Sequence, residues 1–235
     1  MRGEGDLLVI FDCDGVLVDS EPIALSVLRE MLEGQQVKLT DEEIADRFLG
    51  RSLGAVAQAV QQDFGVLLPE DFAAMIRRRL FARYERELKA MPGIHTALEA
   101  LAMRGVSACV ASSSLPERIE KSLAVTGLTQ AFGAHVFSAS MVKAGKPAPD
   151  LFLFAAGQCG FSPANCIVVE DSPAGIEAAQ AAGMRVLAFG GGGHAKSPAF
   201  RQKIAALRPD AWFDAMADLL QVVDGLRSSE DSLHG

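Results

Sequence analysis

Short apolar segments alternate with helical segments through the later part of this chain, and this alternation limits the possible folds more than any other feature. Segments with the length and apolar content of buried strands occur at 107–111, 135–137, 166–169 and 185–189. Helical patterns lie before or between them at 96–104, 117–125, 150–158 and 174–182. A last strand and helix are expected around Trp212 and Leu219. Such alternation predicts an α/β fold with a parallel sheet covered on both faces.

The first predicted strand is separated from the others by a long helical stretch. Residues 7–11 (LLVIF) form a strand-length apolar run, and a polar cluster follows at 12–20. From Pro22 the pattern is helical, with a capping box at Thr40 and Glu43 and a helix cap expected at Ser52. We therefore expect a Rossmann-like parallel-sheet core, residues 1–19 and 91–235, interrupted by an inserted α-helical domain, residues 20–90.

Composition and charge exclude several classes of partner. The chain has 235 residues, of which 49% are apolar, and a formal net charge of −8. Acidic and basic residues are interspersed along the chain, whereas proteins that bind nucleic acids or anionic membranes usually have clustered Lys and Arg. No apolar run approaches the roughly 18 residues that a spanning helix needs. The run at 7–11 is too short for a signal peptide, and Asp12 interrupts it. We therefore expect the protein to bind neither nucleic acid nor membranes. We expect it to be a monomer.

The cysteines indicate a reducing compartment. Cys13, Cys109, Cys159 and Cys166 form no CxxC pair and lie among apolar neighbours. They are therefore interpreted as reduced core thiols of a cytoplasmic protein.

Chemically active side chains follow several predicted strands. They are Asp12, Asp14, Ser112, Ser113, Lys146, Glu170 and Asp171. Each has an ordinary alternative role, because Asp is common in turns, Ser caps helices and acidic residues favour helix starts. In an open parallel sheet, however, functional groups gather at the carboxyl ends of the strands. Several carboxylates beside one lysine predict a divalent-cation site for an anionic substrate.

Four runs of sequence resemble the motifs of a known family. They are FDCDGVLVDSE at 11–21, VASSS at 110–114, GKPAPD at 145–150 and VEDSPAG at 169–175. In order and spacing they resemble the haloacid dehalogenase superfamily, and specifically the subgroup that contains β-phosphoglucomutase and small sugar-phosphate phosphatases. The resemblance covers essentially the whole chain. It implies that the inserted domain, residues 20–90, is the helical cap of that family.

The resemblance also implies roles for the first motif. Asp12 would attack phosphorus and form an aspartyl-phosphate, which divides one difficult displacement into two steps. Asp14 would protonate the leaving oxygen and then deprotonate the attacking water. Gly15 would let the backbone pass close to the phosphoryl group, where a Cβ would obstruct it.

The other motifs would bind phosphate and metal. By resemblance, Ser112, Ser113 and nearby backbone N–H groups hold phosphoryl oxygens, and Lys146 neutralises the charge that develops there. The implied cofactor is Mg²⁺, a hard cation that prefers oxygen ligands. Its implied ligands are Asp12, the carbonyl of Asp14, and Asp171, with Glu170 bound directly or through water.

The expected function is Mg²⁺-dependent hydrolysis of small phosphate monoesters. By resemblance, the substrates are sugar, sugar-alcohol or sugar-acid phosphates. Arg51 lies between two expected helices of the inserted domain. It is predicted to bind the non-reacting end of the substrate, with a solvated helix-start arginine as the alternative.

Three alternatives remain open. A phosphomutase similar to β-phosphoglucomutase would have a histidine where this chain has Ala24, and a Lys-Gly pair where it has Leu49 and Gly50. A carbon–halogen hydrolase would leave Asp14 without a purpose. A non-catalytic binding protein on the same fold would have no reason to keep the complete set of strand-end residues. The glycine run 190–193 lacks the lysine of a nucleotide P-loop and is interpreted as a rim loop.

Overall fold

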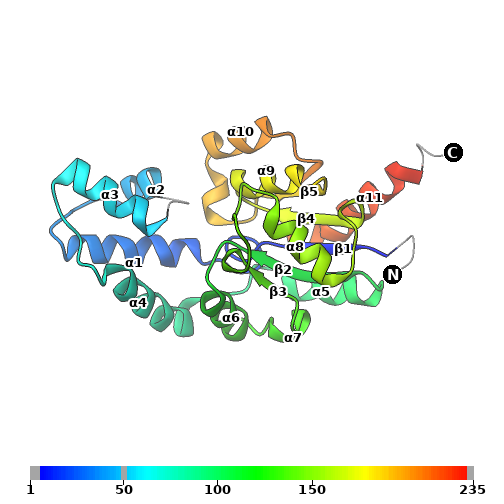
Figure 1. Ribbon diagram of the computed structural model, residues 1–235, viewed down its shortest axis with the longest axis horizontal. Helices are drawn as coiled ribbons and strands as arrows, with labels where there is room; N and C mark the ends of the chain where they lie inside the picture. Colours follow the sequence, from blue (N-terminus) through cyan, green and yellow to red (C-terminus); the bar gives the residue numbers. More distant parts are fainter. Residues whose placement is uncertain (1–5, 49–51, 232–235) are drawn as a thin grey trace. The chain divides into compact units, whose positions relative to one another are not determined.

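The structure is a computed structural model that describes residues 6–48 and 52–231 of the 235-residue chain. The described chain divides into two compact units (Figure 1). One is the helical segment Ser20–Leu88, and the other is the remainder, which contains the sheet. Each unit is described by itself.

A six-stranded parallel sheet forms the centre of the larger unit. Its strands are β1 (Leu8–Phe11), β2 (Ser107–Ser112), β3 (Val136–Ser138), β4 (Cys166–Glu170), β5 (Arg185–Phe189) and β6 (Ala211–Phe213). They lie in the order β3-β2-β1-β4-β5-β6. The change in direction of the strand order falls at β1, which has β2 on one side and β4 on the other. Ligand sites of open α/β sheets lie beside such a point.

The register of the sheet brings the ends of the three middle strands to one level. Phe11, the last residue of β1, pairs with Val110 of β2 and with Val169 of β4. The Asp12 N–H donates to the Val169 carbonyl oxygen at 3.0 Å and extends this pairing by one residue. The residues that follow β1, β2 and β4 are therefore neighbours in space.

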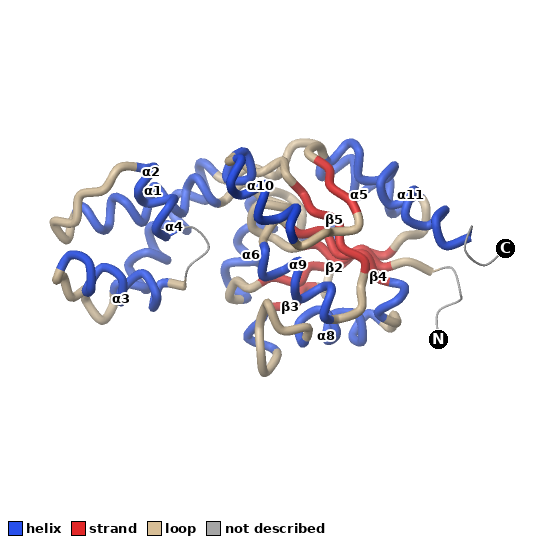
Figure 2. Tube along the Cα trace, turned by 90° about the horizontal axis from the view of Figure 1, so that it is seen from above, coloured by secondary structure: helices blue, strands red, loops and turns tan. Residues whose placement is uncertain are grey.

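Helices cover both faces of this sheet (Figures 1 and 2). They are α5 (Ile94–Met103), α6 (Pro116–Val125), α7 (Thr129–Phe132), α8 (Asp150–Cys159), α9 (Pro173–Ala181), α10 (Pro198–Ala206) and α11 (Leu219–Asp231). Short 3₁₀ segments occur at Ala139–Met141, Pro163–Asn165, Gly193–Lys196 and Met216–Asp218. Alternate residues of β1 serve opposite faces: Leu8 and Ile10 join the core beneath α8 and α9, whereas Phe11 contacts Phe132 of α7 edge-on.

The predicted α/β fold is confirmed, with local differences. The third strand is Val136–Ser138, one residue later than expected, because it pairs along the end of β2 up to Ser138. The short helix α7 and the helix α10 were not predicted. α7 has only four residues, and α10 buries one of its residues, Ile204, so neither shows a clear apolar period in the sequence.

The helical unit contains α1 (Glu21–Glu33), α2 (Asp41–Phe48), α3 (Leu53–Phe64) and α4 (Phe72–Glu87). The predicted capping box is present, since the Glu43 N–H donates to Thr40 Oγ1 at 3.2 Å and the Thr40 N–H donates to Glu43 Oε2 at 2.8 Å. Ser52 caps α3 by accepting from the Ala55 N–H. The last helix of this unit starts at Phe72, because residues 69–71 form a turn closed by the Phe72 N–H and the Pro69 carbonyl.

All four cysteines are buried as thiols. Over the ranges 6–48 and 52–231, no helix combines the length and apolar character needed to cross a membrane.

Candidate active site

Lys146 lies at the centre of the side chains that follow the strands. Its Nζ donates to Asp12 Oδ1 at 2.6 Å and to Glu170 Oε1 at 2.6 Å. A third bond of 2.9 Å goes to the backbone oxygen of Ala111 in β2. The lysine side chain is 3% exposed, and its Nζ lies 4.9 Å from the centre of the Phe152 ring. One buried ammonium thus joins the ends of β1, β2 and β4.

Burial and charge oppose each other in this cluster. Burial favours the neutral amine of Lys146, but the attraction of Asp12 and Glu170 outweighs it and raises the lysine pKa above its usual value. Burial also raises the pKa of the Asp12 carboxyl; Lys146 opposes the rise, and the charges of Glu170 and Asp171 add to it. The 2.6 Å contact is that of an ammonium–carboxylate pair. The cluster therefore holds one cation against an excess of carboxylates.

Glu170 is fully buried and uses both of its oxygens. Oε1 accepts from Lys146, and Oε2 accepts from the backbone N–H groups of Asp171 and Ser172 at 3.0 and 2.9 Å. The Ser172 hydroxyl donates to the same oxygen at 2.9 Å, and it caps α9 by accepting from the Gly175 N–H at 3.1 Å. Glu170 therefore connects Lys146 with the start of α9.

Asp14 belongs to a second group of contacts beside the first. Its Oδ2 accepts from the Ser114 hydroxyl at 2.6 Å, and its Oδ1 accepts from Arg118 Nη2 at 2.8 Å. Gly15 follows with a φ of 84°, a conformation that glycine adopts without strain, and its N–H donates to the Val18 carbonyl at 2.8 Å. The chain thus turns sharply just after the two aspartates.

The serines after β2 have different environments. Ser112 is buried, and its Oγ accepts from the Ser114 N–H at 3.2 Å. Ser113 is exposed. Ser138, at the end of β3, donates its hydroxyl to the Ser114 carbonyl oxygen at 2.7 Å. The loop is therefore fixed at Ser114 and open at Ser113, where a backbone or side-chain donor can meet a ligand.

The structure brings most of the predicted site residues to one end of the sheet, in two adjoining groups. Arg51 lies outside the described residues, as do Leu49 and Gly50. Two residues of the site were not predicted individually, Ser114 and Arg118. The sequence carried one signal for Arg118: it occupies the first turn of α6, where the helix dipole disfavours a cation.

The donors of this cluster fit a hard divalent cation. Asp12 and Asp171 are 8% and 6% exposed, and the charge of Asp171 acts on Asp12. A divalent cation between them would offset the excess negative charge. Mg²⁺ usually takes one or two carboxylates and completes its shell with water and other oxygens. Among the described residues, no three or more Asp, Glu, His or Cys side chains are placed together to hold a metal. A Mg²⁺ site does not require such a group, because two carboxylates are enough.

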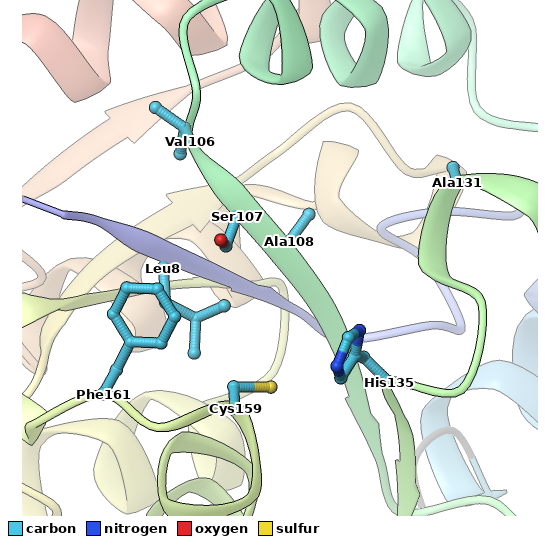
Figure 3. A pocket seen from close by; sticks show the side chains of 8 residues that line it. All are labelled: Leu8, Val106, Ser107, Ala108, Ala131, His135, Cys159 and Phe161. Atoms are coloured by element: carbon cyan, nitrogen blue, oxygen red, sulfur yellow. The ribbon is translucent and has the colours of Figure 1, made fainter. Parts of the chain in front are cut away.

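A cavity of about 240 Å³ lies at the opposite, amino-terminal end of the sheet (Figure 3). Its lining comes from the starts of β1 and β2 and from the segments that precede β3 and β4; it consists of Leu8, Val106, Ser107, Ala108, Ala131, His135, Cys159 and Phe161. Because this lining includes no Asp, Glu, Lys or Arg, it does not offer the charged groups of the strand-end cluster.

The glycine run after β5 has a packing reason. A Cβ at Gly190 would overlap the Trp212 ring and the Asp214 carboxylate, and one at Gly191 would overlap the Phe189 ring. Arg201 closes this cluster, with Nη2 2.7 Å from Asp214 Oδ1. The glycines therefore allow close packing against β6.

Comparison with known proteins identifies the family. The family model for haloacid dehalogenase-like hydrolases matches residues 7–183. The 6-phosphogluconate phosphatase of Escherichia coli K12 is 31% identical over 210 residues, which cover 87% of this chain and 93% of that protein. A haloacid dehalogenase-like protein of unknown function from Agrobacterium tumefaciens has 35% identity and a TM-score of 0.83, covering 95% of this chain and 100% of that one. A family hydrolase from Deinococcus radiodurans R1, solved with phosphate and sodium, has 34% identity and a TM-score of 0.76 over 91% and 93% of the two chains.

The chain belongs to the haloacid dehalogenase-like hydrolases. Within them it is a phosphoric monoester hydrolase, similar in sequence to phosphatases named for phosphorylated carbohydrates and for 6-phosphogluconate. The predicted family and enzyme class are confirmed.

Proposed function

We propose that this enzyme hydrolyses small phosphate monoesters with Mg²⁺ through an aspartyl-phosphate on Asp12. The observation that carries the proposal is the contact of Lys146 with both Asp12 and Glu170 at the carboxyl ends of β1 and β4. Asp14 lies two residues after Asp12, in contact with Ser114 and Arg118. A nucleophile, a proton-transfer group and a fixed cation are the parts that phosphoryl transfer requires.

In the first step, Asp12 attacks the phosphorus atom and the bond to the leaving oxygen breaks. Lys146 holds Oδ1 of Asp12, which orients the other oxygen for attack. The lysine charge and the donors around Ser112 and Ser113 stabilise the phosphoryl oxygens. Mg²⁺, held by Asp12, the carbonyl of Asp14 and Asp171, would reduce the repulsion between an anionic nucleophile and an anionic phosphate. Asp14 gives a proton to the leaving oxygen.

In the second step, Asp14 acts in reverse. Its carboxylate takes a proton from a water molecule as the water oxygen attacks the phosphorus atom of phospho-Asp12. The bond between phosphorus and the Asp12 oxygen breaks, inorganic phosphate is released and the Asp12 carboxylate is restored. Glu170 keeps Lys146 in place during both steps through its Oε1.

The proposed substrates are sugar, sugar-alcohol or sugar-acid phosphates. Support comes from the similar enzyme of Escherichia coli that is named for 6-phosphogluconate, which is a sugar-acid phosphate. Hydrolysis is favoured over a mutase reaction because α1 carries Ala24 where the similar mutases have a histidine. Arg51 stays a prediction for recognition of the non-reacting end of the substrate, and Ser20–Leu88 is proposed to serve as the cap.

A cytoplasmic, monomeric enzyme is also proposed. The four buried thiols are consistent with a reducing compartment.

The proposal is tested by assaying phosphate release from an aryl phosphate and from a panel of sugar, sugar-alcohol and sugar-acid phosphates. Each assay is run with Mg²⁺ and again with excess EDTA. Asp12→Asn, purified identically, is the blank for contaminating phosphatases. We expect Mg²⁺-dependent release with a preference within the panel. Release that is equal for the wild type and Asp12→Asn would reject the proposal.

A further inference from the structure

Both oxygens of the Asp14 carboxylate are held by residues that lie about a hundred positions later in the chain. Ser114 Oγ donates to Oδ2 at 2.6 Å, and Arg118 Nη2 donates to Oδ1 at 2.8 Å. The side chains of Asp14 and Arg118 are 15% and 27% exposed, so the pair is largely removed from solvent. Two charge-assisted bonds on different oxygens fix the rotation of a carboxylate as well as its place.

The position of Arg118 in its helix is electrostatically unfavourable for a cation. It lies in the first turn of α6, after Pro116 and Glu117, where the helix dipole favours an acidic residue. An arginine there is explained by what it contacts, and it contacts Asp14.

The other contact of Asp14 is itself anchored. Ser138, buried at the end of β3, donates to the Ser114 carbonyl oxygen at 2.7 Å, and Ser112 Oγ accepts from the Ser114 N–H at 3.2 Å. The Ser114 hydroxyl is therefore presented to Asp14 by a loop that is fixed to two strands.

We propose that Arg118 is a positioning residue that, together with Ser114, orients the Asp14 carboxylate for proton transfer, above all for removal of a proton from water in the second step. The inference rests on the proposed function, because it presupposes the roles of Asp12 and Asp14. Arg118 does not react: the water proton goes to an Asp14 oxygen, the water oxygen bonds to phosphorus, and the phosphorus–Asp12 bond breaks. A misoriented carboxylate slows this transfer, since displacement of a reacting group by about 1 Å can cost on the order of 100-fold in rate.

An aryl phosphate with a good leaving group separates the two steps. An aryl oxide leaves without a proton, so formation of the aspartyl-phosphate does not need Asp14, whereas its hydrolysis does. In stopped-flow experiments with Mg²⁺, we expect Arg118→Ala to release a burst of about one aryl oxide per active site, at a rate no lower than wild-type turnover. Steady turnover should then be about 10- to 100-fold below the wild type. Ser114→Ala should change the same two quantities in the same direction.

Two arginine variants control for loss of charge and of stability. Arg118→Lys keeps a cationic donor and should recover part of the steady rate. Arg104→Ala removes an exposed ion pair to Asp224 in the same unit and should leave burst and turnover at wild-type values. If Arg118→Ala turns over slowly without a burst, or changes only KM, Arg118 does not position Asp14 for the second step.

Asp14→Asn separates failure of this inference from failure of the proposed function. It should show the same burst with a lower steady rate. No burst in Asp14→Asn contradicts the proposed role of Asp14 itself. A burst in Asp14→Asn that is missing in Arg118→Ala contradicts the role of Arg118 alone.

Discussion

Gly175 lies directly against the carboxyl group of Glu170, so closely that a Cβ at position 175 would overlap the Glu170 carboxyl carbon and both oxygens. Gly175 is in the first turns of α9, and Glu170 is the last residue of β4. The absence of a side chain on the helix therefore leaves the space in which Glu170 reaches Lys146.

Gly175→Ala is expected to damage both stability and activity. Glu170 is fully buried and bonded through both oxygens, so it has no room to move aside. Forcing a methyl group into such a site costs about 1–3 kcal/mol of unfolding free energy, measurable by urea denaturation. Gly157→Ala is the matched control, because Gly157 lies within α8 with nothing near its missing Cβ. That variant should gain up to about 1 kcal/mol. Equal stability of the two variants would contradict the packing argument.

Removing Lys146 is expected to destabilise the fold in a pH-dependent way. Lys146→Met leaves the buried carboxylates of Asp12 and Glu170 without their cation, at a cost of about 3–5 kcal/mol near neutral pH. Burial and the charges of Glu170 and Asp171 already raise the pKa of Asp12, and loss of Lys146 removes the group that opposes the rise. Protonation of Asp12 is then favoured in the folded variant over the unfolded chain, so the destabilisation caused by the loss of Lys146 becomes smaller as the pH falls.

The measurement is urea denaturation of the wild type and Lys146→Met at about pH 8 and about pH 5, because the lower pH favours the protonated form of a carboxyl whose pKa is raised. The difference between the two proteins should shrink at the lower pH. Lys143→Met, which changes an exposed lysine on the same segment, is the control and should match the wild type at both. A difference that is constant or larger at about pH 5 would show that carboxylate charge is not the cause.

Mg²⁺ is expected to stabilise the folded enzyme as well as to support turnover. A ligand that binds only the folded state raises its stability by about 2.7 kcal/mol at a concentration 100 times its Kd. The Tm should therefore rise with Mg²⁺ in the wild type but hardly at all in Asp171→Asn, which loses a proposed ligand.

Ca²⁺ should support turnover poorly, because it prefers more ligands at longer distances. Undiminished turnover after exhaustive chelation would refute the metal requirement.

The cysteines are expected to resist thiol reagents until the protein unfolds. Burial raises the pKa of the Cys13 thiol well above its usual value and that of Cys166 to about 12. Near pH 8 almost none of either is thiolate, the reactive form. Titration with an aromatic disulfide should detect less than one thiol in the native protein and four after denaturation. Rapid reaction of several native thiols would contradict the burial of these residues.

The fold could be predicted because its strands are buried on both faces and therefore read as continuous apolar runs. Residues 7–11 and 166–169 show this most clearly. These apolar runs do not determine the order of the strands in the sheet. It depends on pairings such as Phe11 with both Val110 and Val169, which join segments far apart in the chain. Helix α10 was not predicted because it buries only Ile204.

The site was predictable where its residues follow strands, because the carboxyl ends of parallel strands meet at one edge. Asp12, Lys146 and Glu170 meet there. The contact of Arg118 with Asp14 could not be predicted in this way, since it depends on how α6 leaves β2 and spans 104 positions of sequence. Only the unfavourable place of an arginine at a helix start pointed to it.

Detection of phosphate on Asp12 tests the proposed mechanism most directly. Asp14→Asn is mixed with an aryl phosphate and Mg²⁺, quenched in acid within the first turnover and analysed by intact mass and peptide mapping. We predict one added phosphoryl group per chain, located on Asp12, because the variant forms the aspartyl-phosphate but hydrolyses it slowly. Asp12→Asn should show neither the added mass nor turnover, since an amide cannot attack phosphorus. Phosphate on another residue, or more than a tenth of wild-type turnover in Asp12→Asn, would contradict Asp12 as the nucleophile.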